Sequence, residues 1–331
     1  MSARSEWSSP GYRWGDPHEP RKLDLDEPVS AVQVRTVGGT VNIVGTDGAA
    51  PARLEISAVH GPPLTVTHEH GTLTVAYDDL PWNGFLKWLD RKGWNRSAVV
   101  SVTVPAGTRV EVGVVSAAAV VSGISGHTDL RGVSGDSTLV RLTGAVRADT
   151  VSGRVEAQAV TGDLRFNSVS GDLTVVEGSG SAVKAESVSG DIVLDLAPTA
   201  KGADIALTTV SGEIAIRLPD PADAKVDANT AGGAVSCAFD DLRVTGQWGA
   251  KRITGTLGPG NGRLKATTVS GAIALLRGPS AEESPHDAPG IPRDPEAPGA
   301  PPAPGPPDTS GGPDSSGAPG SPAGPVGEKV L

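Results

Sequence analysis

Five acidic residues each follow the last residue of a short repeated phrase, and they are the groups of this sequence best placed to do chemistry. They are Asp136, Asp163, Asp172, Asp191 and Glu213. A nine-residue period with glycine and aspartate is typical of calcium-binding β-rolls, which need further glycines and carboxylates to fold oxygen ligands around the ion. Here His127, Ala145 and Arg154 interrupt the acidic positions. The sequence therefore favours solvated turn aspartates over a calcium site.

Two of these carboxylates on neighbouring turns could also hydrolyse a glycan, as in parallel β-helix enzymes. None of the acids is set apart by its sequence context, and the repeats contain no aromatic cluster that could hold sugar rings. We therefore expect no catalytic residue and no enzymatic activity. A carbohydrate-active β-helix enzyme stays as the less favoured alternative.

Histidines form the next candidate site. His68 and His70 are two residues apart in a predicted hairpin, with His60 nearby in sequence. Residues two apart on a strand share a face, so this spacing can bind zinc. No motif fixes a third ligand, and we expect an exposed hairpin without metal.

The sequence contains no clear motif for binding a cofactor. Cys237 is the only cysteine, which excludes an intrachain disulfide and a cysteine-based metal site, and we expect a buried, inert thiol there. The sequence has no glycine-rich phosphate loop, no serine nucleophile elbow and no basic patch interleaved with aromatics. We expect no cofactor.

The acids belong to a repeated phrase, Val-Ser-Gly, that organises the middle of the chain. It appears in full at six places, of which Val169-Ser170-Gly171 is typical, and diluted copies fall between them. From Gly126 to Gly171 its glycines recur every 9 residues. The positions two and four residues after the glycines are almost all apolar, for example Leu173 and Val175, and they alternate with polar residues. This alternation predicts strands with one buried face.

The repeats predict an all-β fold, a parallel β-helix or β-solenoid with short coils. Each coil should contain two main strands in roughly 18 to 22 residues and stack on similar neighbours. We expect the glycine to form a tight corner, where a Cβ would clash or φ would be positive. The serine or threonine before it should hydrogen-bond locally or to the next rung.

The chain divides into four predicted parts. Residues 1–27 are expected to be an irregular arm, 28–107 an N-terminal β segment with hairpins, 108–278 the solenoid repeats, and 279–331 a disordered tail rich in proline, glycine and alanine. The tail cannot bury enough apolar surface to offset the entropy lost on ordering.

An aromatic insert, residues 81–95, interrupts the N-terminal segment. It carries Trp82, Phe85, Trp88 and Trp94, in a chain with only 6 tryptophans and 3 phenylalanines. We expect it to cap an open end of the β body, because exposed strand edges aggregate; a partner- or membrane-docking helix is the alternative. With His68 and His70, these four aromatic residues are the candidate interaction surface.

The net charge and the hydropathy of the chain argue against some classes of partner and location. The net charge is −10, which makes a nucleic-acid backbone an improbable partner. No apolar run approaches the roughly 18 residues that a membrane-spanning helix needs. The first residues lack the apolar stretch of a secretory signal, which favours the cytoplasm.

The repeated Val-Ser-Gly-Asp, the tryptophan-rich insert before Val102–Gly107 and the acidic composition resemble the DUF4097 β-strand-repeat family, whose members also carry the label "putative adhesin". The resemblance covers residues 28–277. It implies a parallel β-solenoid with no established enzyme activity and no family functional residues to carry over. The composition and tail resemble those of actinobacterial proteins.

The outward-facing Thr, Ser, Asp and Arg side chains of the repeats do not converge on one site. The sequence therefore favours a non-catalytic cytoplasmic scaffold that binds an unidentified protein partner along a flat β face. A cell-surface adhesin-like protein is the alternative.

Overall fold

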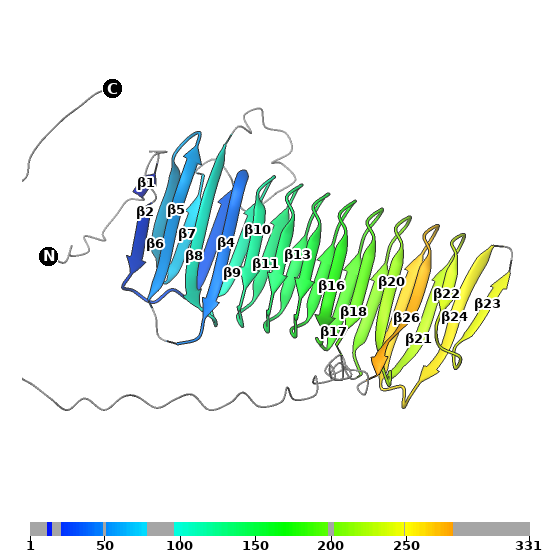
Figure 1. Ribbon diagram of the computed structural model, residues 1–331. Coiled ribbons are helices and arrows are strands. Elements are labelled where there is room, and N and C mark those ends of the chain that lie inside the picture. The colour runs from blue at the N-terminus through cyan, green and yellow to red at the C-terminus, as the bar shows by residue number, and fades with distance from the viewer. Residues whose placement is uncertain are drawn as a thin grey trace, which may run out of the picture. The chain divides into compact units, whose positions relative to one another are not determined.

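The computed structural model describes residues 12–14, 21–48, 51–77, 96–197, 202–247 and 249–280. These residues belong to one compact unit, residues 1–285. Their regular elements are all β-strands, which form a 14-stranded sheet, here called sheet A, and a 12-stranded sheet, called sheet B. Figure 1 shows the strands of this unit stacked side by side along one axis.

The strands of sheet A, in chain order, are β1 (Tyr12–Trp14), β3 (Ala31–Thr36), β6 (Leu64–Glu69), β7 (Thr72–Ala76), β9 (Arg109–Val114), β11 (Thr128–Gly132), β13 (Val146–Asp149), β15 (Leu164–Asn167), β17 (Ala182–Glu186), β19 (Asp204–Thr208), β21 (Ala224–Thr230), β23 (Arg243–Gln247), β24 (Ala250–Leu257) and β25 (Gly262–Thr268). The strands of sheet B are β2 (Arg21–Leu25), β4 (Gly38–Thr46), β5 (Ala52–His60), β8 (Ser97–Pro105), β10 (Ala118–Ser122), β12 (Ser137–Val140), β14 (Val155–Gln158), β16 (Leu173–Gly178), β18 (Ile192–Leu196), β20 (Ile214–Asp220), β22 (Val235–Cys237) and β26 (Ile273–Ser280).

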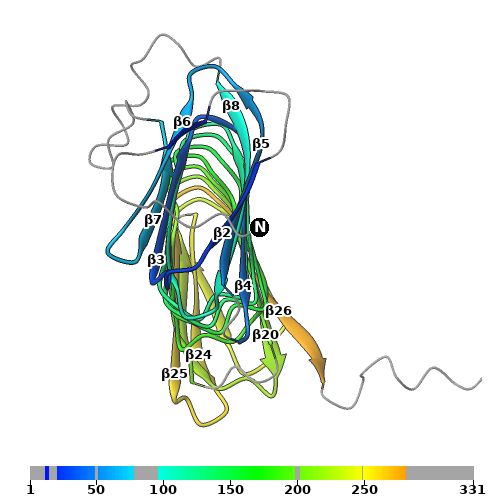
Figure 2. The same cartoon turned by 90° about the vertical axis from the view of Figure 1, so that its left-hand side faces the viewer.

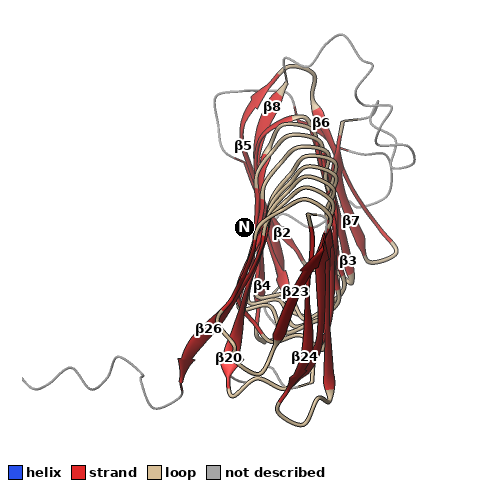
Figure 3. Cartoon of the chain, turned by 90° about the vertical axis from the view of Figure 1, so that its right-hand side faces the viewer, coloured by secondary structure: helices blue, strands red, loops and turns tan. Residues whose placement is uncertain are grey.

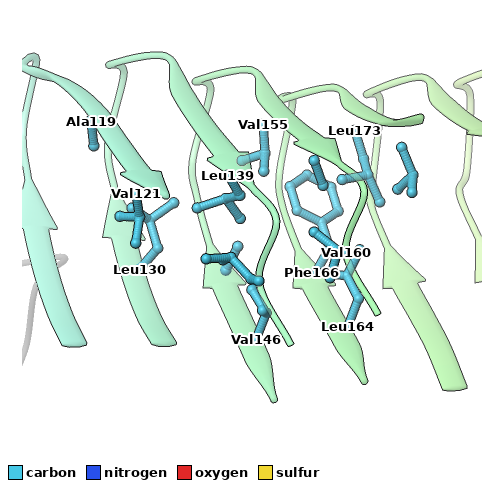
Figure 4. Close-up of a cluster of buried hydrophobic side chains, with 14 of the residues drawn as sticks. Ala119, Val121, Leu130, Leu139, Val146, Val155, Val160, Leu164, Phe166 and Leu173 are labelled. Carbon is cyan, nitrogen blue, oxygen red and sulfur yellow. The ribbon is translucent and has the colours of Figure 1, made fainter. Parts of the chain in front are cut away.

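The core lies between the two sheets, which Figures 2 and 3 show face to face from the two ends of the stack. It forms because apolar residues alternate with polar ones along each strand. In β18, Ile192 and Leu194 are buried, while the next residue after Ile192, Val193, is exposed. Figure 4 shows inward side chains of both sheets meeting, among them Leu164 and Phe166 of β15 and Leu173 of β16. The predicted inward and outward positions are confirmed for these strands.

Each coil contributes one strand to each sheet, and equivalent residues of successive coils pair in parallel. Val155 lies beside Leu173, Leu173 beside Ile192, and Ile192 beside Ile214, so the coil length grows from 18 to 19 and then to 22 residues. The structure confirms the all-β solenoid with two-strand coils of this length.

The stacking order differs from the chain order at both ends. Strands β25 and β26 pair directly with β19 and β20, and β21 and β22 lie beyond them. After β20 the chain leaves one strand position empty in each sheet and places β21 and β22 beyond it. It then forms the antiparallel hairpin β23–β24 and returns as β25 and β26, which fill the empty positions. At the other end, β7 and β8 lie on the outer side of β3 and β4. A local repeat pattern gives no information about such a crossover, because each coil offers the same edges to its neighbours.

Antiparallel strands close the N-terminal end of the stack. Strand β2 pairs with β5, and β1 pairs with β6. These two strands lie within residues 1–27, for which the sequence indicates an irregular arm. They form because the outer edges of β6 and β5 would otherwise present unpaired backbone groups, which β1 and β2 satisfy. Leu25 of β2 is buried, which fixes its register on the core.

A glycine packs at most of the corners where the chain passes from sheet A to sheet B, and Ala117 takes this position between β9 and β10. A Cβ built on Gly190 would lie 1.9 Å from the carbonyl oxygen of Gly171, and one on Gly271 would lie 1.8 Å from that of Gly212. The φ angles of Gly190 and Gly271 are outside the left-handed region, so lack of space, rather than backbone conformation, excludes a side chain. Of the two reasons that the sequence leaves open for a corner glycine, the steric one applies.

Replacing a corner glycine by alanine should therefore destabilise the protein. We expect Gly190→Ala to lower the free energy of unfolding by about 2 kcal/mol or more, because the methyl group must push two coils apart. Gly107→Ala is the matched control, since a Cβ there would meet nothing within 4 Å. Urea unfolding followed by circular dichroism measures both. Equal stability of the two variants would contradict the steric account.

Candidate functional site

The serine of the repeated phrase ties each corner to the preceding coil. The hydroxyl of Ser170 donates to the carbonyl oxygen of Val151 over 3.3 Å, and the Ser170 N–H donates to the same oxygen over 2.8 Å. The same two bonds recur at Ser134, Ser152, Ser189, Ser211 and Ser270. Of the two roles predicted for this serine, the bond to the neighbouring rung is the one the structure shows.

A second hydroxyl, three residues before the glycine, was missed by the sequence analysis. Thr209 is buried, and its Oγ1 accepts the Gly212 N–H over 3.1 Å and donates to the Gly190 carbonyl over 3.3 Å. The bond from the glycine N–H recurs from Gly171 to Ser168, Gly190 to Ser187, Gly233 to Thr230 and Gly271 to Thr268. The signal was present in the sequence, where Ser or Thr stands three residues before each of these glycines.

The acidic residues after the glycines also bond to the backbone. Asp172 Oδ1 accepts the N–H of Asp191 over 3.0 Å, and Asp191 Oδ1 accepts that of Glu213 over 2.8 Å. Asp136 does the same for Arg154, and Asp163 accepts the N–H of Ala182 and the hydroxyl of Ser181. Carboxylates thus satisfy corner N–H groups of the following coil, a role in which any short acceptor serves.

Metal-ligating side chains do not gather in the described ranges. There, no three or more His, Cys, Asp or Glu side chains are arranged to hold a metal ion. Cys237 is half-buried rather than buried, because β22 is the last strand of sheet B and lacks an outer neighbour. Its Sγ lies 3.6 Å from the carbonyl oxygen of Phe239.

The histidine pair is separated by the turn. His68 lies on β6, whereas His70 is outside the strand with φ of 50°, followed by Gly71 with φ of 73°. Two residues with positive φ make the tight turn that suits a two-residue hairpin, and the two side chains therefore do not share a strand face. The hairpin itself is confirmed by the antiparallel pairing of β6 with β7.

The environments of the two histidines differ as well. The His68 side chain is only 4% exposed, with Nδ1 3.9 Å from Glu27 Oε2, so it offers little surface to a partner. His70 is exposed, and His60 belongs to β5 of the other sheet. The other candidate interaction residues, Trp82, Phe85, Trp88 and Trp94, lie outside the described residues, as do the rest of the insert and residues 281–331.

The valine of the repeated phrase does not always face the core. Val115 and Val133 are buried, as the apolar pattern predicts, but in later coils the equivalent side chains are about half exposed. These are Val169, Val188, Val210 and Val269. All six valines lie in a corner and not on a strand, so strand alternation does not determine the direction of their side chains.

The outward faces of the two sheets differ in charge. On sheet A, ion pairs form within single strands, between Arg131 and Asp129, Arg147 and Asp149, and Lys184 and Glu186. On the repeat strands of sheet B, the outward positions are mostly Val, Thr and Ala, and the charged groups among them include Glu156 and the pair Arg217–Asp195, whereas the N-terminal strands β2 and β5 carry the pairs Lys22–Glu55 and Arg53–Asp24. Examples of the uncharged positions are Val120, Thr138, Val140, Thr174, Val176, Val193, Ala215 and Ala274. Sheet B therefore offers the less charged face.

A hollow of about 940 Å³ lies on sheet A where β21, β23, β24 and β25 meet. Its wall includes Lys251, Lys265 and the pair Arg252–Asp227, whose Nε–Oδ1 and Nη2–Oδ2 distances are 2.8 Å and 2.7 Å. The hydrogen bonds from Arg252 lower the pKa of Asp227, so its carboxylate stays ionised at neutral pH.

No helix in the described ranges is long and apolar enough to cross a membrane.

The buried corner hydroxyls should matter for stability. We expect Thr209→Val to lower the free energy of unfolding by roughly 1–2 kcal/mol, because the Gly212 N–H loses its acceptor in a buried corner. Thr174→Val, on the outward face of β16, is the isosteric control and should change stability little. Thermal and urea unfolding measure both variants. A Thr209→Val protein as stable as the control would show that the corner does not need this bond.

Comparison with known proteins gives the family. The family model described as Toastrack DUF4097 matches residues 54–276. No curated protein matches the chain. Similar solved structures include a "putative cell adhesion protein" from Clostridium sporogenes, at 11% identity over 78% of this chain and 100% of that one, with a TM-score of 0.28. A "putative adhesin" from Bacteroides fragilis is 13% identical over 78% of this chain and 96% of that one, with a TM-score of 0.35.

These likenesses are too distant to carry an argument about function. The family match does not depend on them, because it spans most of the chain and includes the repeats, the corners and both sheets. It also agrees with the resemblance drawn from the repeated phrase. The chain belongs to the Toastrack DUF4097 family.

Proposed function

We propose that the protein is a non-catalytic cytoplasmic scaffold that binds a protein partner through the outward face of sheet B. The observation that carries the proposal is the difference between the two faces. In the repeat coils, sheet A carries intrastrand ion pairs, whereas sheet B presents a surface of Val, Thr and Ala with few charges.

A weakly charged face suits protein association because binding removes water from it at low cost. Charged side chains lose their hydration when they are covered, and this loss often cancels their attraction for the partner. Valine and alanine lose nothing comparable and gain from burial. Val193 and Leu276, on β18 and β26, are 42% and 44% exposed, so a partner would bury apolar surface that folding leaves in water.

The repeat gives this face a regular spacing. Equivalent residues of neighbouring strands are about 4.8 Å apart in a sheet. Thr174, Val193, Ala215 and Ala274 form one such row, because each pairs with the next across the stack. A partner that makes one favourable contact with this row can repeat it on the next coil.

The arrangement of the acids supports a non-catalytic role. Asp136, Asp172 and Asp191 each accept a backbone N–H from the following coil. An acid in such a bond is held at a corner by the fold, and the Asp172 carboxylate also lies 4.0 Å from Arg154.

Affinity purification from the native cell tests the proposal. Wild-type protein should recover a stoichiometric partner, and the double variant Val193→Glu/Leu276→Glu should recover at least about tenfold less, because two charges would have to be buried in the interface. Both side chains are exposed, so we expect the variant to fold, and circular dichroism checks this. Arg165→Glu, an exposed position on β15 of sheet A, is the control and should recover as much partner as the wild type.

Three outcomes would contradict the proposal. The wild type would recover no stoichiometric partner, the double variant would recover it undiminished, or the Arg165→Glu control would lose it equally. Fractionation of the same cells addresses the location, because recovery from the cell surface alone would favour the adhesin-like alternative.

A further inference from the structure

Sheet A ends in an edge strand that is accessible on both faces. Among the described residues, β23 pairs only with β24, and it is the last strand in the order of the sheet. All five of its residues, Arg243 to Gln247, are exposed. Figures 1 and 3 show β23 beside β24 at the end of the stack. In an antiparallel pair, alternate residues direct their N–H and C=O groups away from the partner, so the outer edge of β23 can bond to another strand.

Sheet A extends further than sheet B at this end. Sheet B stops at β22, a strand of three residues, whereas sheet A continues past β21 through β24 and β23. Val244 of β23 lies opposite the buried Ile253 of β24 but is itself 51% exposed. The inner face of β23 therefore carries an apolar side chain that no strand of sheet B covers.

The outer face of the same strand is basic. Arg243 and Thr245 lie opposite Thr254 and Arg252 of β24, and Thr245 and Gln247 form part of the wall of the hollow. Arg252 is paired with Asp227, but no carboxylate of the described ranges forms an ion pair with Arg243, Lys251 or Lys265. Lys265 lies beside Asp227 in the β21–β25 pairing, so in the described ranges two cations, Arg243 and Lys251, remain without an ion pair at one end of a chain whose net charge is −10.

We propose that β23 binds an extended acidic segment of another protein, which adds to sheet A as a further strand. The backbone of the segment would bond to the free edge of β23. Since strand side chains alternate, one set would lie on the outer face, where acidic groups meet Arg243, whereas Lys251 lies on the inner face with Ile253. The other set would lie beside Val244, where apolar groups fit. The chemistry that β23 fits is therefore a strand of alternating acidic and apolar residues.

The charges favour this occupant over a second copy of the chain. If two copies of β23 paired with each other, each copy would bring the same unpaired cations, Arg243 and Lys251, to one interface. Like charges across a sheet destabilise the pair. An acidic segment brings the opposite charge to the same place.

Fluorescence anisotropy with labelled peptides tests the proposal on the full chain. One probe is an eight-residue peptide of alternating glutamate and valine, and the other has lysine in place of glutamate. The glutamate peptide should bind at least about tenfold more tightly than the lysine peptide, and added salt should weaken its binding because exposed charges are screened. Equal affinities, or no binding of the glutamate peptide up to about 1 mM, would overturn the proposal.

Matched variants locate the site. Val244→Lys should weaken binding of the glutamate peptide at least about tenfold, because a charge on the inner side of an edge strand blocks strand addition. Val193→Lys makes the same change at an exposed valine of sheet B and should leave the affinity unchanged. Likewise Arg243→Glu/Lys251→Glu should weaken binding, whereas Arg165→Glu should not. Equal losses in the two valine variants or in the two charge variants would refute this location.

Sedimentation velocity tests the other candidate for this edge, which is a second copy of the chain. A dimer that Val244→Lys abolishes and Val193→Lys preserves would overturn the acidic segment in favour of a second copy. This site is independent of the face proposed for the scaffold, so the peptide can bind even if affinity purification finds no partner for sheet B.

Discussion

The close approach of successive corners is the constraint on which the rest of the structure depends. At Gly190 and Gly271 the carbonyl oxygen of the neighbouring coil occupies the space that a Cβ would take. This contact sets the spacing of the coils at the edge, and strand pairing sets it along the two sheets. At these two corners a residue with a Cβ would push the neighbouring coils apart. The glycine therefore acts between coils, although it recurs as a local motif.

The corners also solve the hydrogen-bonding problem of a solenoid edge. Where the chain leaves one sheet for the other, backbone N–H groups lose their ladder partners, and a buried unpaired N–H is costly. Serine, threonine and aspartate supply the missing partners, as at Ser170, Thr209 and Asp172. These hydroxyl and carboxylate side chains therefore take part in hydrogen bonds that hold the corners together. The surfaces available for binding are the outward faces of the sheets and the strand edges that pairing leaves free.

Much of the fold can be predicted from the sequence because its information is local and repeated. The alternation around Ile192 and Leu194 gives the inward face, and the spacing of the glycines gives the coil length. The order of the last coils cannot be predicted in this way, because β25 fits beside β19 by the same pairing that would fit β21. The exposure of Val169 escapes the pattern since corner residues do not follow strand periodicity.

The candidate site was harder to predict than the fold. His68 and His70 satisfy a strand rule in sequence, but the turn begins between them and the rule no longer applies. The contrast between the faces and the free edge at Val244 depend on which strands lie beside each other, and the strand order was not available from the repeats. The binding sites proposed for this chain thus rest on features that the repeated phrase does not encode.

Amide hydrogen exchange at the corners tests the central claim most directly. If successive corners are held together by close contact and hydrogen bonds, the N–H groups of Ser170, Ser189 and Ser211 should exchange as slowly as those of the flanking strands, with protection factors of about 10³ or more. Exchange at the rate of solvent-exposed turns, while the strands remain protected, would show that the corners are loose connections and would contradict the account.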